Sequence, residues 1–253
     1  MTSDSTIDVV LVYPELLGTY GDRGNAAALV HRARARGLSI RVVDVALADP
    51  MPTQGDIYLI GGGEDAAMLL AWEHLYPGHG LSDAMVAGAA CFGVCAGFQL
   101  LAHDFTGPDG SRREGLGLLD VRCGRLSQAR AVGEVLADSV EGLDLGFLTG
   151  FENHQGDARL GPAARPLGRL VRGVGNGDST TEGAVQGRVI GSYLHGPALV
   201  RNDGLADHLL QLVAGSLPPT TDEPVRRLRT ERRAAALAGH EPRRRRLHLR
   251  GGH

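Results

Sequence analysis

The chain has 253 residues, of which 43% are hydrophobic and 22% charged, and its formal net charge is −3. These values are ordinary for a soluble globular protein, and the length is enough for one domain with a full core. No run of about 18 apolar residues occurs and the first residues are polar, so we expect no transmembrane segment, no secretory signal and a cytoplasmic protein.

All 26 basic side chains are arginines. Without lysine the chain has neither a Walker A lysine nor a Schiff-base lysine, which excludes a P-loop ATPase and a pyridoxal phosphate enzyme. The three cysteines lack paired spacing, and no group of histidines, cysteines and acids has the spacing of metal ligands. We therefore expect no disulfide framework, no metal and no cofactor in this chain.

The first half alternates between strand and helix patterns. We predict strands over 7–13, 38–45, 56–60 and the apolar run before Cys95, and helices over 25–36, 65–75, 81–88 and directly after Cys95. This alternation predicts an α/β fold with three layers, in which helices flank a mostly parallel central sheet. In such sheets the reactive groups gather at the carboxyl ends of the strands.

The second half predicts a mixed β portion that packs on the first half. Short strands separated by glycine-rich turns are expected over 116–121, 131–136, 147–152, 168–173 and 182–186, followed by a buried strand over 188–194 and a helix over 203–214. We place the domain boundary at Pro218, with one domain over 1–217.

Residues 218–253 are predicted to be an Arg-rich, mobile C-terminal extension. The stretch from 221 to 253 contains ten arginines and four acids, including a short helix pattern over 231–237 and the arginine block Arg243–Arg246. A basic block of this kind suits an anionic partner or a solvated tail. We favour the solvated tail and expect no nucleic acid binding.

Cys95 is the strongest candidate for a nucleophile. It lies between a buried apolar strand and a helix pattern, with Gly93 and Gly97 on either side. A tight turn of this kind lifts one side chain out of the sheet to a helix N-terminus, where N–H groups favour a thiolate. Cys91, inside the strand, is interpreted as a core residue.

Two further segments end at the same edge of the predicted sheet. His195 follows the buried strand over 188–194, the place for a general base, and Gly61-Gly62-Gly63 follows the strand over 56–60. The bare N–H groups of Gly62, Gly63 and the residue after the nucleophile, Ala96, are candidates for an oxyanion hole. Nucleophile, base and oxyanion hole together predict acyl-transfer chemistry.

Several stretches resemble class I (triad-type) glutamine amidotransferases, in the cobyric-acid-synthase-like branch. The segment Gly93–Gln99 matches the nucleophile motif GxCxGxQ, and the likeness extends over about 8–214. Further matching stretches are YPELL, YGDRGN, GGGED, GFENHQG and GSYLHGP. YGDRGN and FENHQG make the chain similar to the GatD-type glutaminase subunits of lipid II isoglutaminyl synthase.

The resemblance implies a division of labour between two subunits. This chain would hydrolyse L-glutamine through a Cys95 thioester and release ammonia. A Mur-ligase-like partner of the MurT type would use ATP and Mg to activate the D-glutamate of lipid II for amidation, giving D-isoglutamine in peptidoglycan synthesis. The resemblance also assigns substrate binding to Gln99 and to an arginine past the elbow, for which Arg130 fits best and Arg125 is the rival.

The sequence departs from the common class I pattern after the histidine. Many members carry a glutamate two residues further on, where this chain has Pro197. Either a Cys–His pair suffices, or an acid arrives from elsewhere: an Asp of the partner, as the resemblance suggests, or Glu152 or Glu182 of this chain.

Four residues of the matching motifs have open roles. His154 either lines the site or the ammonia exit, or fixes a loop by hydrogen bonds. Asp22, Arg23 and Asn25 either cap the first helix or contact the partner.

Two alternative functions remain open at this stage. A glutaminase of a cobalamin-type amidating system shares the elbow and the missing glutamate. A thiol protein similar to DJ-1 shares the sheet and the elbow cysteine but has no need of His195.

Overall fold

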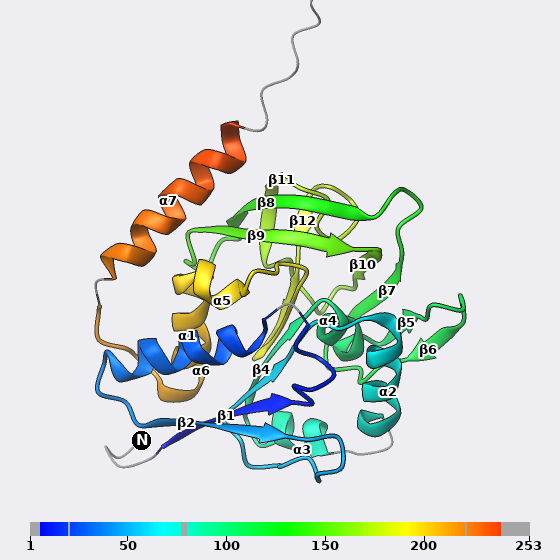
Figure 1. Ribbon diagram of the computed structural model, residues 1–253, viewed down its shortest axis with the longest axis horizontal. Coiled ribbons are helices and arrows are strands. Elements are labelled where there is room, and N and C mark those ends of the chain that lie inside the picture. The colour runs from blue at the N-terminus through cyan, green and yellow to red at the C-terminus, as the bar shows by residue number, and fades with distance from the viewer. Residues whose placement is uncertain (1–5, 20, 77–79, 221, 239–253) are drawn as a thin grey trace, which may run out of the picture.

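A mostly parallel sheet forms the centre of the computed structural model (Figure 1), which describes residues 6–19, 21–76, 80–220 and 222–238. Within these residues the sheet has six strands, in the order β13 (Ala184–Gln186), β14 (Val189–Ser192), β4 (Ala90–Val94), β3 (Ile57–Ile60), β1 (Ile7–Val12) and β2 (Ile40–Val45). Only β13 and β14 pair antiparallel; the other neighbours are parallel. The predicted three-layer α/β fold is confirmed.

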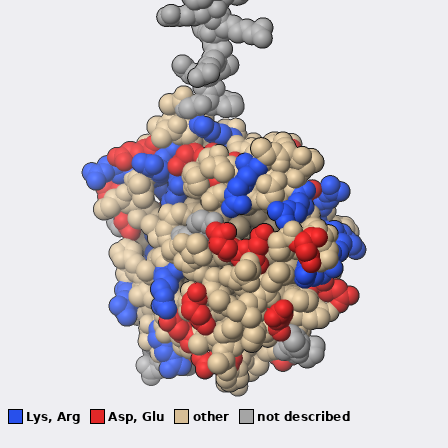
Figure 2. Space-filling model, turned by 45° about the vertical axis from the view of Figure 1, so that its right-hand side comes forward, with Lys and Arg blue, Asp and Glu red and all other residues tan. Residues whose placement is uncertain are grey.

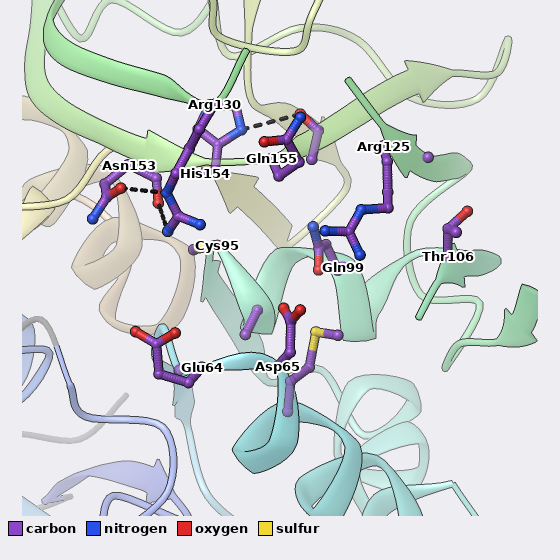
Figure 3. A pocket seen from close by; sticks show the side chains of 15 residues that line it. Glu64, Asp65, Cys95, Gln99, Thr106, Arg125, Arg130, Asn153, His154 and Gln155 are labelled. Atoms are coloured by element: carbon purple, nitrogen blue, oxygen red, sulfur yellow. Dashed lines mark hydrogen bonds between the residues drawn. The ribbon is translucent and has the colours of Figure 1, made fainter. Parts of the chain in front are cut away.

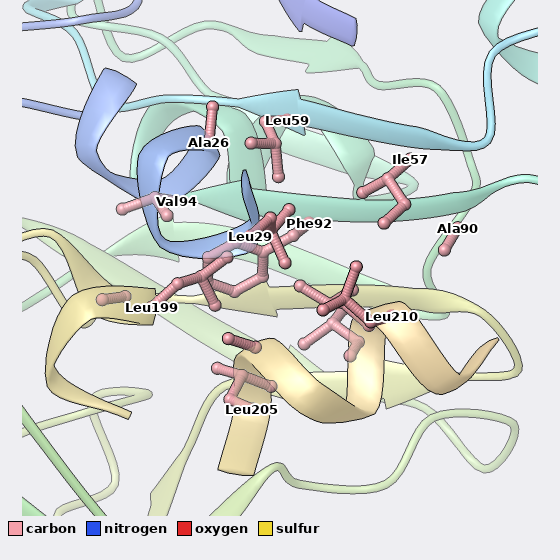
Figure 4. Packing of buried hydrophobic residues seen from close by; sticks show 14 of the residues in the cluster. Ala26, Leu29, Ile57, Leu59, Ala90, Phe92, Val94, Leu199, Leu205 and Leu210 are labelled. Carbon is pink, nitrogen blue, oxygen red and sulfur yellow. The ribbon is translucent and has the colours of Figure 1, made fainter. Parts of the chain in front are cut away.

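Helices cover both faces of the central sheet. One face carries α1 (Arg23–Arg34) and α6 (Asp203–Ala214); the other carries α2 (Asp65–Leu75), α3 (Gly80–Val86) and α4 (Ala96–Leu101). Successive side chains of a strand point to opposite faces. In β1, Leu11 packs in one apolar cluster with Leu29 of α1 and Leu205 of α6, whereas Val10 packs in the other with Met68 of α2. Figure 4 shows the first cluster.

The second half of the described residues forms two smaller sheets. The first has the order β10 (Gly156–Leu160), β7 (Val121–Arg125), β5 (Asp104–Thr106) and β6 (Arg112–Glu114); the second has the order β12 (Thr181–Glu182), β11 (Gly168–Arg172), β8 (Ala131–Ser139) and β9 (Phe147–His154). The expected mixed β portion is therefore present, but β5, β6, β7, β10 and the short helix α5 (Ala198–Arg201) were not predicted.

Two strand predictions were wrong. In the strand predicted over 116–121, residues 116–120 are irregular, because the N–H groups of Leu116 and Leu118 donate to carbonyl groups at the end of α4 instead of to a strand. The predicted strand over 182–186 is broken at Gly183, which adopts a φ of 62°. Its two parts, β12 and β13, pair in different sheets.

The C-terminal segment contains a longer helix than the sequence predicted. α7 runs over Glu223–Ala238, where only 231–237 was expected. The Arg229 guanidinium lies 4.5 Å from the Phe147 ring centroid and donates to the Phe147 carbonyl and to Asp203, so the helix packs on the body of the molecule. The domain boundary stays a prediction, and Arg243–Arg246 lie outside the described residues.

No helix among the described residues is long and apolar enough to span a membrane.

Candidate active site

The ends of three neighbouring strands bring the predicted site together. β3 and β14 both pair in parallel with β4, the strand that ends directly before Cys95. The Cys95 N–H donates to the Ser192 carbonyl oxygen at 2.9 Å. The Gly61–Gly63 turn, Cys95 and the segment leading to His195 therefore leave the sheet at one edge, as the sequence predicted.

The turn at Cys95 has the strained geometry expected of a nucleophile elbow. Its φ of 54° and ψ of −103° lie in a region that side chains other than glycine rarely adopt. A Cβ atom on Gly97 would lie 2.1 Å from the Ile60 carbonyl oxygen, and one on Gly93 would lie 2.8 Å from the Gly97 carbonyl oxygen. The two glycines are required because the chain passes through a space with no room for side chains.

Cys95 is held as a thiol rather than a thiolate. Burial raises the pKa of its side chain to about 12, and the Ala96 N–H, which lowers that pKa, offsets only part of the effect. The sequence predicts that the N-terminus of α4 favours a thiolate, but the burial of the sulfur has the larger effect on this pKa. A base must therefore accept the thiol proton when the sulfur reacts.

His195 is a buried neutral imidazole suited to that task. Burial lowers its pKa below the usual 6.5 and outweighs the Phe151 carbonyl group, which raises it. Its Nδ1 atom lies 3.0 Å from the Phe151 carbonyl oxygen. A carbonyl oxygen can only accept, so Nδ1 carries the proton and Nε2 carries the lone pair that accepts a proton from a thiol.

The two internal acids proposed for the His195 partner are engaged elsewhere. The Glu152 carboxylate accepts hydrogen bonds from the N–H groups of Val174 and Gly175 at 2.9–3.0 Å. Oε1 of Glu182 accepts the Ser192 hydroxyl at 2.7 Å and the Tyr193 N–H at 3.0 Å. The single Nδ1 proton of His195 goes to the Phe151 carbonyl group instead.

Cys95 lines a pocket with oppositely charged sides (Figure 3). Glu64 and Asp65, at the start of α2, lie on one side, and two arginines lie on the other. Figure 2 shows acidic and basic side chains around a hollow on this face of the molecule. The other lining residues are Gly63, Met68, Ala96, Gln99, Thr106, Gly124, Arg125, Arg130, Asn153, His154, Gln155 and Gly156.

Arg130 is anchored beside the candidate nucleophile. Its Nε atom donates to Asn153 Oδ1 at 2.7 Å and its Nη2 atom donates to the Asn153 carbonyl oxygen at 3.0 Å. Its charge lowers the pKa values of both Cys95 and His195, although burial has the larger effect on each. Arg125 also lines the pocket. Asn153 was missed as a functional residue, although it lies inside the FENHQG stretch.

The candidate oxyanion donors differ in availability. The Gly62 N–H donates to Asp22 Oδ2 at 2.9 Å. Gly63 and Ala96 line the pocket together with Cys95. The role of Gly62 stays a prediction, and its N–H is engaged by Asp22 in this structure.

Asp22 and Asn25 are buried, so neither side chain faces a partner. They are 5% and 2% exposed, respectively. Arg23, between them in sequence, is exposed and pairs with Asp44. Of the three residues, only Arg23 is exposed enough to contact another protein.

His154 lines the pocket and also contacts the backbone of the segment that follows it. Its Nδ1 atom lies 3.0 Å from the Gly156 carbonyl oxygen, and its ring stacks on Tyr193 with 3.9 Å between the ring centroids. Gln99 contacts the same tyrosine, with its Nε2 atom 3.4 Å from the Tyr193 hydroxyl group.

In the part of the chain that the structure describes, no three His, Cys, Asp or Glu side chains group as a metal site requires. The described cysteines Cys91, Cys95 and Cys123 are unpaired thiols.

Comparison with known families decides the class of this site. Residues 8–203 match the model of the CobB/CobQ-like glutamine amidotransferase domain. The chain belongs to this family. It is therefore a glutamine amidotransferase, whose pocket is lined by Cys95 and by two of the candidate oxyanion donors, Gly63 and Ala96.

Curated relatives include the GatD subunits of two species. The chain is 34% identical over 198 residues to the glutamine-hydrolysing lipid II isoglutaminyl synthase subunit GatD of Staphylococcus aureus, covering 77% of this chain and 79% of that protein. It is 33% identical to the same subunit of Streptococcus pneumoniae, covering 81% and 79%. The cobyric acid synthase of Sorangium cellulosum is 33% identical, but the match covers 67% of this chain and only 37% of that enzyme.

Solved structures support the fold. A crystal structure of a glutamine amidotransferase aligns with a TM-score of 0.55 and 24% identity, covering 81% of this chain and 98% of that one. The structure of PurLQS from Thermotoga maritima aligns with a TM-score of 0.57 and 17% identity, covering 83% and 97%.

Proposed function

We propose that this chain is the glutaminase subunit of a lipid II isoglutaminyl synthase. It hydrolyses L-glutamine and supplies ammonia to a Mur-ligase-like, ATP-dependent partner that amidates the D-glutamate of lipid II. The relatives support this assignment: the GatD subunits of two species are 34% and 33% identical to this chain over 77% and 81% of its residues. ATP and Mg are expected on the partner, because this chain has no lysine for a P-loop.

The charged sides of the pocket are the observation that supports glutamine as the substrate. A free α-amino acid carries one carboxylate and one ammonium group. Arg130 offers a guanidinium fork to the carboxylate, and Glu64 and Asp65 lie on the opposite side for the ammonium group (Figure 3). The side-chain amide of glutamine then extends toward Cys95.

The proposed reaction proceeds through a thioester. His195 Nε2 accepts the thiol proton as the Cys95 sulfur bonds to the amide carbon, and the N–H groups of Gly63 and Ala96 stabilise the oxyanion. The C–N bond breaks as the imidazolium returns the proton to the leaving nitrogen, which releases ammonia. Water, deprotonated by His195, then attacks the thioester, so that glutamate leaves and the thiol is restored.

The test measures ammonia release from L-glutamine by the chain together with its Mur-ligase-like partner, ATP and lipid II. We expect Cys95→Ala and His195→Ala to abolish release and Glu141→Gln, at an exposed site, to leave it unchanged. Intact release in either active-site variant would refute the mechanism. Labelling of Cys95 by a glutamine-derived diazo-ketone that excess glutamine does not prevent would instead favour a thiol protein without glutaminase activity.

A further inference from the structure

Two buried side chains at the start of α1, Asp22 directly before the helix and Asn25 in its first turn, connect the two halves of the active site. Asp22 Oδ2 accepts the Gly62 N–H at 2.9 Å, and Asp22 Oδ1 accepts the Asn25 Nδ2 group at 3.2 Å. Asn25 Oδ1 in turn accepts the Leu199 N–H at 2.9 Å. Three hydrogen bonds thus run without interruption from the glycine turn after β3 to the start of α5.

Both ends of this chain of bonds lie beside proposed reacting groups. Gly62 directly precedes Gly63, a candidate oxyanion donor, and Leu199 lies four residues after His195. The start of α1 also packs directly on the histidine segment, since a Cβ atom on Gly24 would lie 2.2 Å from Pro197 Cγ. The start of this helix therefore lies between the Gly61–Gly63 turn and the segment that follows His195.

We propose that Asp22 and Asn25 are positioning residues that hold the Gly61–Gly63 turn and the His195–Leu199 segment in register, so that the Gly63 N–H is presented to the oxyanion. This inference rests on the proposed glutaminase function and deepens it by assigning the YGDRGN stretch a role inside the site.

Such a restraint is needed because three consecutive glycines define no backbone conformation by themselves. The N–H groups of Gly62 and Gly63 belong to consecutive peptide planes, so fixing the first plane restricts the second. Asp22 fixes the first plane by accepting its N–H. A donor that is already oriented stabilises an oxyanion without reorganisation during the reaction.

The donor and acceptor pattern allows a reciprocal test. In Asp22→Asn, an amide NH₂ group faces the NH₂ group of Asn25, and in Asn25→Asp two carboxylates face each other. In the double variant D22N/N25D the pattern is restored: the new amide accepts from Gly62 and donates to the new carboxylate, which also accepts from Leu199. Asp44→Asn is the matched control, since Asp44 is exposed and pairs with Arg23.

The assay is the burst of p-nitrophenolate from p-nitrophenyl acetate, measured on the full-length chain. In this reaction the Cys95 sulfur bonds to the acetyl carbon, the thiol proton passes to His195, and p-nitrophenolate leaves with the electron pair. It requires the oxyanion hole but neither glutamine nor a partner. Cys91 and Cys123 are fully buried, and Cys95→Ala gives the background.

We expect each single variant to acylate about 10-fold more slowly, because a misaligned oxyanion donor loses part of the 10²–10³-fold that a removed donor costs. The double variant should return to within about 3-fold of the wild type, and D44N should match the wild type. If Asp22 and Asn25 only stabilise the fold, the single variants should have lower melting temperatures and the double variant a restored one. The acylation rate of the folded protein should then be the same in all of them.

The proposal is overturned if the folded double variant is no faster than the slower single variant, or if the single variants acylate at the wild-type rate. A wild type without a Cys95-dependent burst also overturns it. If a single variant does not fold, the double variant decides alone: a rate within about 3-fold of the wild type supports the proposal, and a slower rate refutes it. Rescue of the burst without ammonia release from glutamine would refute the glutaminase function and leave the positioning role intact.

Discussion

Glu182 of β12 is a buried carboxyl group whose ionisation opposes folding. Burial raises its pKa from 4.5 to about 7, although the Ser192 hydroxyl and the Tyr193 N–H lower it. Its Oε2 atom has no hydrogen-bond partner among the described residues. Glu182→Gln removes the charge and keeps an acceptor oxygen for Ser192 and Tyr193.

The sign and size of the effect follow from the raised pKa. The folded protein binds this proton more tightly than the unfolded chain does, so the group lowers stability as the pH rises from 4.5 to about 7. At about 1.4 kcal/mol for each pKa unit, the cost above that window is about 3 kcal/mol, and below pH 4.5 it is absent.

Urea unfolding of the wild type and of Glu182→Gln between about pH 5 and pH 8 measures this cost of ionising Glu182. We expect the free energy of unfolding of Glu182→Gln, relative to the wild type, to rise by about 2 to 3 kcal/mol across that range. Any cost that does not depend on pH, such as a buried amide NH₂ group without an acceptor, cancels in this comparison. Glu141→Gln, at an exposed site, should give a flat difference. A flat difference for Glu182→Gln as well would refute the reasoning.

Three further predictions concern the site and the C-terminal helix. Since burial lowers the pKa of His195, kcat/KM for glutamine should decline on the acid side with a midpoint below 6.5, and a midpoint above that value would contradict a buried neutral base. Arg130→Ala should raise KM for glutamine about 10-fold or more, because a charge-assisted hydrogen bond to the substrate is lost. An equal or larger effect of Arg125→Ala would assign the glutamine carboxylate to Arg125 instead. Arg229→Ala should lower the free energy of unfolding by about 1 to 3 kcal/mol in urea titrations and leave the rate of Cys95 acylation unchanged; a slower acylation would link α7 to the site.

The elements that carry the site could be predicted because their signals are local. The strand before Cys95 is a continuous apolar run, and the glycines beside it reflect a local crowding of the backbone. The same holds for the position of His195 after a buried strand. Parallel pairing then places both at one edge without any further information.

Contacts between distant segments could not be predicted in the same way. Asn153 holds Arg130 because β8 and β9 pair in one particular register, which no single stretch specifies. Asp22 was interpreted as a helix cap or a partner contact, since its acceptor role depends on Gly62, 40 residues away. The Arg-rich composition of α7 likewise predicted a solvated tail, because the aromatic ring that its arginines cover, Phe147, lies in β9.

The Phe151 carbonyl group explains how His195 is oriented without the glutamate that many class I enzymes place two residues later. Backbone hydrogen bonds run both ways between Phe151 and His195, at 2.9 and 3.1 Å, and the Phe151 carbonyl oxygen also receives the Nδ1 proton. The backbone therefore sets the tautomer that a carboxylate sets elsewhere. A neutral carbonyl group stabilises an imidazolium less than a carboxylate does, because charge-assisted hydrogen bonds are about twice as strong as neutral ones. The Phe151 carbonyl group thus orients His195, but it stabilises the charged base less than the carboxylate of other class I enzymes would.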